Sequence, residues 1–216
     1  MDKRIKKFQK AFIIFTIAQI FILLGLFDYF TQVKALSDWL FIFTIMQLIG
    51  CILMVVSAIM LVDFNRNYFY LFVTAIIETF VILLASVADE SVEDFTVAWS
   101  RGLAISGDIL LGLIYIYFFL GTRDYFKENG LGENVKRSKV GFWVIVISMI
   151  VINLVSFVRT FNIVKTNYIV ASILRYGSLL LEFIMYGFVF VVLLLMIILM
   201  QKKRKEALIN EKPEEQ

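Results

Sequence analysis

Six long apolar runs divide this chain, and they constrain its fold more than any other feature. Each is long enough, or nearly so, to cross a hydrocarbon layer of about 30 Å as a helix rising about 1.5 Å per residue. In lipid, backbone amides must form hydrogen bonds within their own segment, so we expect helices. The predicted fold is an all-α polytopic membrane protein whose six transmembrane helices form three consecutive hairpins. The predicted spans are about 11–27, 39–62, 68–88, 102–121, 140–158 and 177–200, followed by a polar cytoplasmic tail at 201–216.

Composition supports a membrane location. Apolar residues make up 61% of the 216 residues, and the mean hydropathy of +0.86 exceeds what a soluble domain needs. The runs do not alternate polar and apolar residues, as the strands of a transmembrane barrel do. The basic start of the chain resembles a signal peptide, but no small-residue cleavage pattern follows, so we expect a retained first span. The expected partner is the lipid bilayer, and we expect no nucleic acid partner because the basic residues flank the spans.

The basic residues predict how the chain is oriented, because cytoplasmic loops carry an excess of Lys and Arg. Sixteen of the 21 belong to segments on one predicted side, and five to the other. Both termini are therefore predicted to be cytoplasmic. The sixteen are Lys3, Arg4, Lys6, Lys7, Lys10, Arg66, Arg123, Lys127, Lys136, Arg137, Lys139, Lys202, Lys203, Arg204, Lys205 and Lys212; the five are Lys34, Arg101, Arg159, Lys165 and Arg175.

The last apolar run, 168–200, is too long for a perpendicular span. Arg175 lies within it, so we expect the membrane portion to begin nearer Gly177. The polar tail is expected to prolong this helix briefly and then fray.

Each predicted hairpin carries one strongly polar residue in each of its helices. The two members of a pair are 28, 30 and 29 residues apart in the three hairpins. Two arginines also precede an acid by seven residues, which is nearly two helical turns and places each pair on one face. The pattern suggests an internal repeat. The pairs are Gln19 with Gln47, Glu78 with Asp108, and Asn153 with Glu182; the arginines are Arg101 and Arg175.

The three acids are the candidate functional residues. A charged side chain in mid-bilayer costs about 2.5–3.5 kcal/mol on insertion scales, so Glu78, Asp108 and Glu182 should face the bundle interior or water. In one interpretation they bind a cation, a proton or the positive group of a substrate, with Arg101 and Arg175 at the vestibule. In the other, each acid is protonated or paired and fixes only the helix register, and the arginines reach to the interface. Gln19, Gln47 and Asn153 are predicted to form hydrogen bonds between helices.

The residues that the chain lacks argue against enzymatic chemistry. There is no histidine and only one cysteine, Cys51, so histidine-ligated metal sites, Ser–His pairs and thiolate clusters are excluded. No glycine-rich phosphate loop is present. We therefore expect no enzyme, no cofactor and no metal site.

One stretch of about 35 residues resembles the last hairpin of the bacterial multi-pass membrane family called domain of unknown function 2569. That ending has an Arg before the last span, a Pro-Tyr-Phe and a Ser-x-Arg element. In this chain an Ile replaces the Pro, and Gly-Thr replaces the Ser-containing element. The resemblance implies a bacterial cytoplasmic membrane and no catalytic role. It is carried by Ser91, Val92, Glu93, Asp94, Arg101, Ile116, Tyr117, Phe118, Gly121, Thr122, Arg123 and Phe126.

Two classes of function remain open from the sequence. The first is a small transporter or membrane-embedded substrate-binding subunit whose interior carboxylates bind a small molecule or ion. The alternative is a non-catalytic partner or regulator of another membrane protein complex, whose helices and basic cytoplasmic loop 122–139 bind the other protein.

Overall fold

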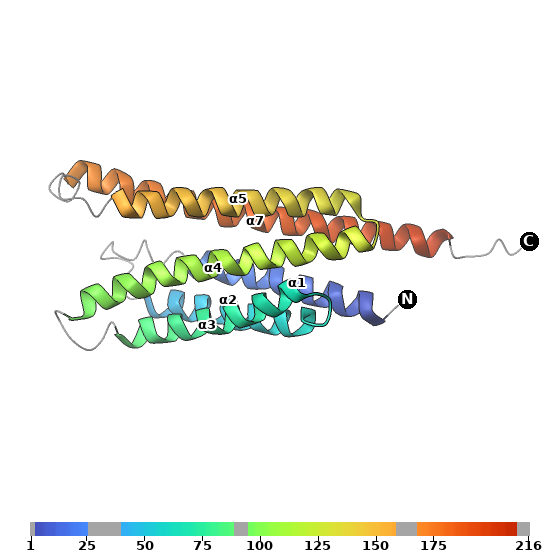
Figure 1. The fold of residues 1–216 in the computed structure, drawn as a ribbon, viewed down its shortest axis with the longest axis horizontal. Helices are drawn as coiled ribbons and strands as arrows, with labels where there is room; N and C mark the ends of the chain where they lie inside the picture. The colour runs from blue at the N-terminus through green and yellow to red at the C-terminus, as the bar shows by residue number, and fades with distance from the viewer. Residues whose placement is uncertain (1–2, 26–39, 89–94, 159–167, 211–216) are drawn as a thin grey trace, which may run out of the picture.

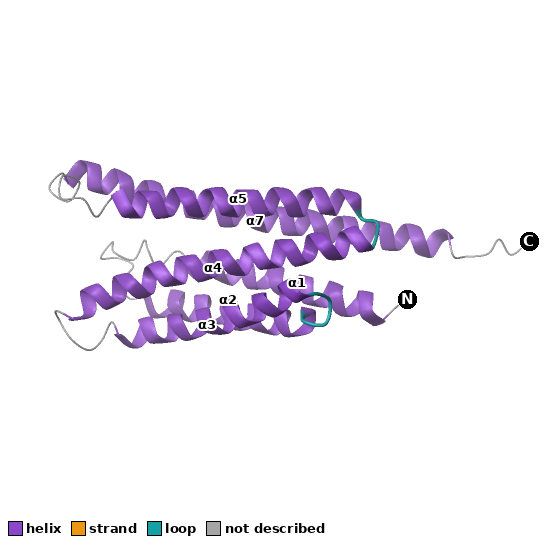
Figure 2. Ribbon diagram, in the orientation of Figure 1, coloured by secondary structure: helices purple, strands orange, loops and turns teal. Residues whose placement is uncertain are grey.

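The computed structural model describes residues 3–25, 40–88, 95–158 and 168–210, and every element in these ranges is an α-helix or a short turn (Figures 1 and 2). The helices are α1 (Lys3–Gly25), α2 (Leu40–Leu61), α3 (Arg66–Ala88), α4 (Phe95–Glu128), α5 (Gly132–Val158) and α7 (Tyr168–Asn210). Within the described residues, these six helices are long and apolar enough to cross a membrane. This confirms the predicted all-helical, multi-pass architecture.

The helices run along one axis and pack in chain order. Each helix packs against its neighbours in the chain, and α7 also packs against α1, so the contacts close into a ring. In Figure 1, α5 and α7 form one layer, α1, α2 and α3 form another, and α4 lies between them. The start of α1, both short turns and the end of α7 lie at the same end of the bundle, which we call the charged end (Figure 1).

Aromatic rings fill the interior towards the charged end. Phe8 of α1 stacks on Tyr125 of α4 with ring centroids 3.6 Å apart, and two turns further along α1 Phe15 stacks on Phe118 at 3.7 Å. Tyr68 of α3 contacts both Phe8 and Phe118 edge-on. This aromatic cluster, comprising Phe8, Phe12, Phe15, Tyr68, Phe118, Tyr125 and Phe126, closes the bundle interior at that end.

At the two turns of the charged end, identifiable residues begin helix α3 and end helix α4. Asn65 is the N-cap of α3: its side-chain oxygen accepts hydrogen bonds from the amides of Asn67 and Tyr68. Its amide nitrogen donates to the carbonyl of Gly121 on α4. The α4–α5 turn is a Schellman motif: Gly130 has φ +68°, and the amide of Leu131 donates to the carbonyl of Phe126.

Several helices continue beyond the predicted spans. The helix α1 begins at Lys3 rather than near 11, α4 runs from Phe95 to Glu128, and α5 begins at Gly132 rather than near 140. The helix α7 is continuous from Tyr168 to Asn210, so it extends ten residues past Met200. The flanking segments are rich in Lys, Arg, Glu and Gln, which have good helix propensity, so the helices extend beyond the apolar runs.

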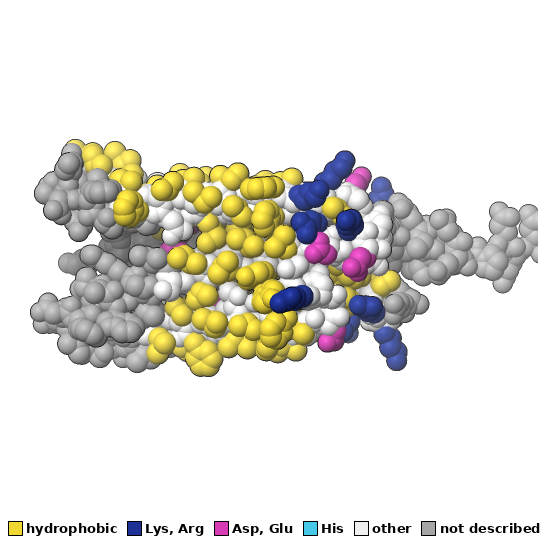
Figure 3. Space-filling view, viewed as in Figure 1, with side chains coloured by type: hydrophobic (Ala, Val, Ile, Leu, Met, Phe, Trp, Pro, Cys, Tyr) yellow, Lys and Arg dark blue, Asp and Glu magenta, His cyan; other side chains and the backbone are white. Residues whose placement is uncertain are grey.

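The surface matches this multi-pass fold. On the face drawn in Figure 3, a broad apolar area covers the middle of the bundle, and basic and acidic side chains gather at the charged end. Many large apolar side chains of the helices are exposed, including Phe80, Trp143 and Ile147. An apolar surface of this extent requires a covering of lipid or protein.

Candidate functional site

Glu78 is the most deeply placed of the predicted acids. It lies at the thirteenth of the 23 positions of α3, on the face that also carries Leu71, Thr74, Ala75 and Ile82, all of which are buried. Only 1% of Glu78 is exposed. Its Oε2 atom is buried and has no hydrogen-bond partner within the described part of the chain. An unpaired buried carboxyl is costly, so its retention calls for a physical explanation.

Gly107 of α4 lies opposite the Glu78 carboxyl group. A β-carbon at Gly107 would lie 3.5 Å from Oε1 and 3.8 Å from Oε2 of Glu78. Gly107 has no side chain, so the carboxyl group faces the backbone of α4 at this point. Asp108 follows directly, and its carboxylate is close enough to Glu78 for the two charges to interact.

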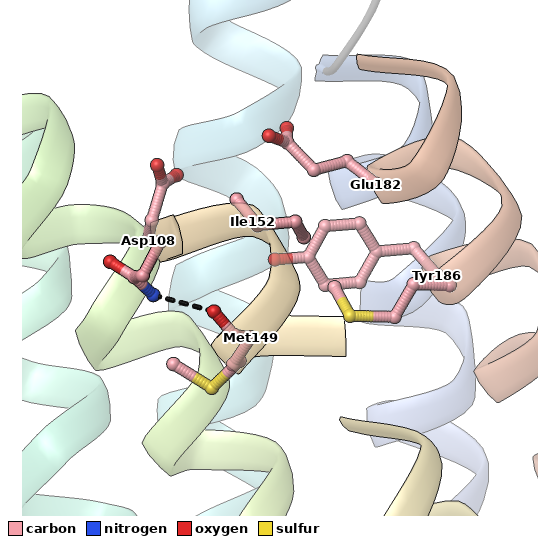
Figure 4. Close-up of a pocket in the computed structure, with 7 residues that line it drawn as sticks. Asp108, Met149, Ile152, Glu182 and Tyr186 are labelled. Atoms are coloured by element: carbon pink, nitrogen blue, oxygen red, sulfur yellow. Dashed lines mark hydrogen bonds between the residues drawn. The ribbon is translucent and has the colours of Figure 1, made fainter. Parts of the chain in front are cut away.

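Asp108 and Glu182 line one small pocket between α4, α5 and α7. The other lining residues are Met149, Ile152, Asn153, Met185 and Tyr186. Figure 4 shows the Asp108 and Glu182 carboxyl groups on opposite walls of this pocket, with Ile152 and Tyr186 between and below them. The pocket has room for about one water molecule. In Figure 3 a recess with acidic atoms at its edge lies between the α5–α7 layer and α4, towards the end opposite the charged end.

Gln19 ties three helices together at the centre of the bundle. It is fully buried on α1, donates from Nε2 to the carbonyl of Tyr186 on α7 at 3.2 Å, and accepts a hydrogen bond from the hydroxyl of Tyr115 on α4. Tyr115 and the thiol of Cys51 on α2 both lie within electrostatic range of Glu78. Polar groups from five helices therefore meet around mid-depth.

The remaining predicted residues have different surroundings. Asn153 faces the pocket, but its amide donates to the carbonyl of Met149 in its own helix, as the dashed line in Figure 4 marks. Gln47 is partly buried, and no hydrogen bond of its side chain is found among the described residues. Arg101 and Arg175 lie in α4 and α7, but their side chains fall outside the described residues.

The ionisable side chains of the site that the structure describes include acids and no Lys or Arg. Neither Glu78 nor Asp108 forms an ion pair within the described ranges, where the salt bridges join Lys7 to Asp63 and Arg123 to Asp124 at the charged end. The described residues hold no group of three or more Cys, Asp or Glu side chains suited to a metal ion. The arrangement can accept a proton or a small cation at the Glu78–Asp108 pair.

Sequence reasoning missed Tyr115 and Tyr186 as parts of the site. Both are buried in the middle of spans, whereas tyrosines in membrane helices are enriched near the interfaces. Their position in the middle of the spans was the sequence feature that could have identified them. The role of Gly107 could not be predicted from the sequence, because its contact with Glu78 depends on how α3 packs on α4.

The fold and the site define a multi-pass membrane protein with carboxylates inside its helical bundle. Comparison of the chain with protein-family models, curated proteins and solved structures finds no match. The resemblance to the domain of unknown function 2569 family therefore stays a prediction.

Proposed function

We propose that this protein binds and moves a small cationic solute across a bacterial cytoplasmic membrane, as a transporter or as the membrane-embedded binding subunit of one. The observation that carries the proposal is Glu78, a carboxyl group that is 1% exposed and whose Oε2 has no hydrogen-bond partner among the described residues. Ionisable groups inside membrane bundles tend to mark substrate or ion pathways. Asp108 and Glu182 continue the line of acids from Glu78 into a pocket.

The proposed orientation places the charged end in the cytoplasm. Basic residues of α1, the α4–α5 region and α7 gather there (Figure 3), as the positive-inside rule requires. The pocket lies farther from that end, so we expect it to exchange solute with the outer side. Both termini would then be cytoplasmic.

Electrical recording from reconstituted vesicles tests the proposal. Purified full-length protein on a solid-supported membrane is exposed to steps in Na⁺, K⁺, ammonium or pH. We expect a transient current for at least one of these cations, lost in Glu78→Gln and reduced in Asp108→Asn. The matched control is Glu133→Gln, which removes an exposed carboxylate at the charged end and should leave the current unchanged.

The result depends on equal folding of the variants. Size-exclusion elution and melting temperature should match those of the wild type, because neither acid holds an ion pair in the described structure. Absence of current for every cation in the wild type, or an undiminished current in Glu78→Gln, contradicts the proposal.

One observation favours the second candidate, a partner or regulator of another membrane complex. The helix α7 continues to Asn210 and projects beyond the bundle at the charged end (Figure 1). A projecting basic helix offers a contact surface for a soluble or membrane-bound partner. Truncation after Gln201 should then abolish co-purification of a stoichiometric partner in mild detergent while leaving the bundle folded. Reproducible purification of the full chain without any partner contradicts this candidate.

A further inference from the structure

The buried carboxyl group of Glu78 needs a partner that neutralises its charge. An ionised carboxylate inside a bundle costs several kcal/mol unless a cation, hydrogen-bond donors or a proton compensates it. Among the described residues, the titratable groups that face Glu78 from the packed helices are Cys51 on α2 and Asp108 and Tyr115 on α4. None of them carries a positive charge. The Tyr115 hydroxyl already donates its hydrogen to Gln19.

The donor set at Glu78 suits a proton better than a metal cation. Hard cations such as Ca²⁺ take six to eight oxygen ligands, and Mg²⁺ demands a near-octahedral set. Among the described residues, Asp108 is the second carboxylate at Glu78, and no group of three or more Cys, Asp or Glu side chains is suited to a metal ion. A proton needs one oxygen. Two carboxylates in electrostatic contact also repel each other when both are ionised, so the pair favours retaining a proton.

Among the described residues, the packing favours an exit for the proton away from the charged end. Towards the charged end, the aromatic cluster of α1, α3 and α4 closes the bundle interior, with Phe15 stacked on Phe118. Towards the other end, Asp108 lines the pocket that it shares with Asn153 and Glu182, which has room for about one water molecule. Water in that pocket would reach Asp108 but not the buried Oε2 of Glu78.

We infer that Glu78 is a proton-binding site and that Asp108 exchanges its proton with water in the α4–α5–α7 pocket. In the release step the O–H bond of Glu78 breaks and one forms on the Asp108 carboxylate, so Glu78 becomes the anion and Asp108 the neutral acid. Asp108 then gives this proton to water and is ionised again. This inference deepens the proposed function by naming the proton as the cation.

Infrared difference spectroscopy on the full-length protein in lipid vesicles tests the inference. A protonated carboxyl gives a carbonyl band that shifts when H₂O is replaced by D₂O. We expect such a band at neutral pH in the wild type, lost in Glu78→Gln and retained in Glu133→Gln. In Asp108→Asn the band should persist while its deuterium exchange slows about a hundredfold, within the range that positioned proton-transfer groups contribute.

The outcomes separate the parts of the inference. A wild type without the band, or with a band that Glu78→Gln leaves intact, overturns proton binding at Glu78. If the deuterium exchange rate of the band is unchanged in Asp108→Asn, the proton does not leave through Asp108. If Glu78→Gln fails to fold, Glu78→Asp retains a carboxyl in a different position and must shift the band; an unshifted band overturns the assignment.

The same measurements distinguish this inference from the proposed function. If a Na⁺ or K⁺ current depends on Glu78 but no band of protonated Glu78 is seen, the proposed function holds and the inference that the cation is a proton is overturned. A Glu78 band without any current leaves a proton-binding site in a protein that does not transport cations.

Discussion

The backbone of Gly107 on α4 faces the carboxyl group of Glu78 on α3, with 3.5 Å between Oε1 and the place that a β-carbon of Gly107 would occupy. That distance is an ordinary van der Waals contact. An alanine therefore fits without displacing α3, but its methyl group would lie against the carboxyl beside Asp108. With glycine at this position, no side chain of residue 107 lies against the Glu78 carboxyl group.

Gly107→Ala should accordingly slow cation flux without unfolding the protein. Alanine also favours a helix interior over glycine by about 1 kcal/mol, so the melting temperature should stay level or rise. Current amplitude in vesicles and the melting temperature in detergent are the two measurements. A fall in both quantities would mean that the methyl group disrupts the α3–α4 packing rather than the carboxyl site.

Glu78→Met should stabilise the fold while abolishing the current. Methionine has a similar length and fills irregular apolar space, and it removes an unpartnered buried carboxyl that costs about 1–3 kcal/mol on protein mutational scales. The free energy of unfolding, measured by reversible denaturation in mixed micelles, should rise or stay unchanged. A loss of more than about 1 kcal/mol, beyond the scatter of neutral substitutions, would instead give Glu78 a structural role.

Gln19 and Tyr115 should be energetically coupled. Gln19→Leu leaves the Tyr115 hydroxyl without its acceptor, and Tyr115→Phe leaves Gln19 Oε1 without its donor. Once one partner is gone, loss of the second should cost less. A double-mutant cycle should give a coupling of about 0.6–1.7 kcal/mol, the range seen for hydrogen bonds between membrane helices.

Gln47→Leu is the control for that cycle, because no hydrogen bond of Gln47 is found among the described residues. Combined with Tyr115→Phe it should show additive effects. Strict additivity between Gln19→Leu and Tyr115→Phe would contradict the hydrogen bond that links α1 to α4.

The sequence predicted the six long apolar helices but not which helix faces meet. In lipid, the outward and inward faces are both apolar, so hydrophobic periodicity carries little information about burial. Phe80 and Phe12 illustrate this, because the first is 62% exposed and the second is fully buried. In the sequence, only the polar residues indicated which face of a helix points inward, and Glu78 does lie on a buried face.

The matched polar pairs do not have matched environments. Gln19 bonds to two other helices, whereas Asn153 bonds within its own helix. Equal spacing along the chain therefore does not give equal contacts. Each contact depends on which helices are neighbours in the closed ring, as α7 is to α1. The internal repeat stays a prediction.

Gly50→Ala should weaken the contact between α1 and α2. A β-carbon at Gly50 would lie 2.8 Å from Cδ1 of Ile22 and 3.1 Å from the backbone carbonyl oxygen of Ala18. Overpacking of this kind costs about 1–3 kcal/mol, which outweighs the gain of about 1 kcal/mol in helix propensity. At Gly187 nothing lies within 4 Å, so Gly187→Ala should be neutral or stabilising. Equal gains in unfolding free energy at both positions would show that α1 and α2 do not pack this closely.

Lys7 and Asp63 should give the charged end a measurable pH dependence. Lys7 Nζ lies 2.6 Å from Asp63 Oδ2 and links α1 to the α2–α3 turn. The hydrogen bond and charge of Lys7 hold the pKa of Asp63 below its usual value. Because the folded-state pKa is lowered, the interaction contributes above about pH 4, the unfolded-state pKa, and is lost as the pH falls through the folded-state pKa. Carboxyl ¹³C NMR should show this low pKa in the wild type and in Lys10→Gln, and a rise towards the ordinary aspartate value in Lys7→Gln. Equal Asp63 pKa values in all three proteins would mean that Lys7 does not pair with the turn in the membrane-embedded bundle.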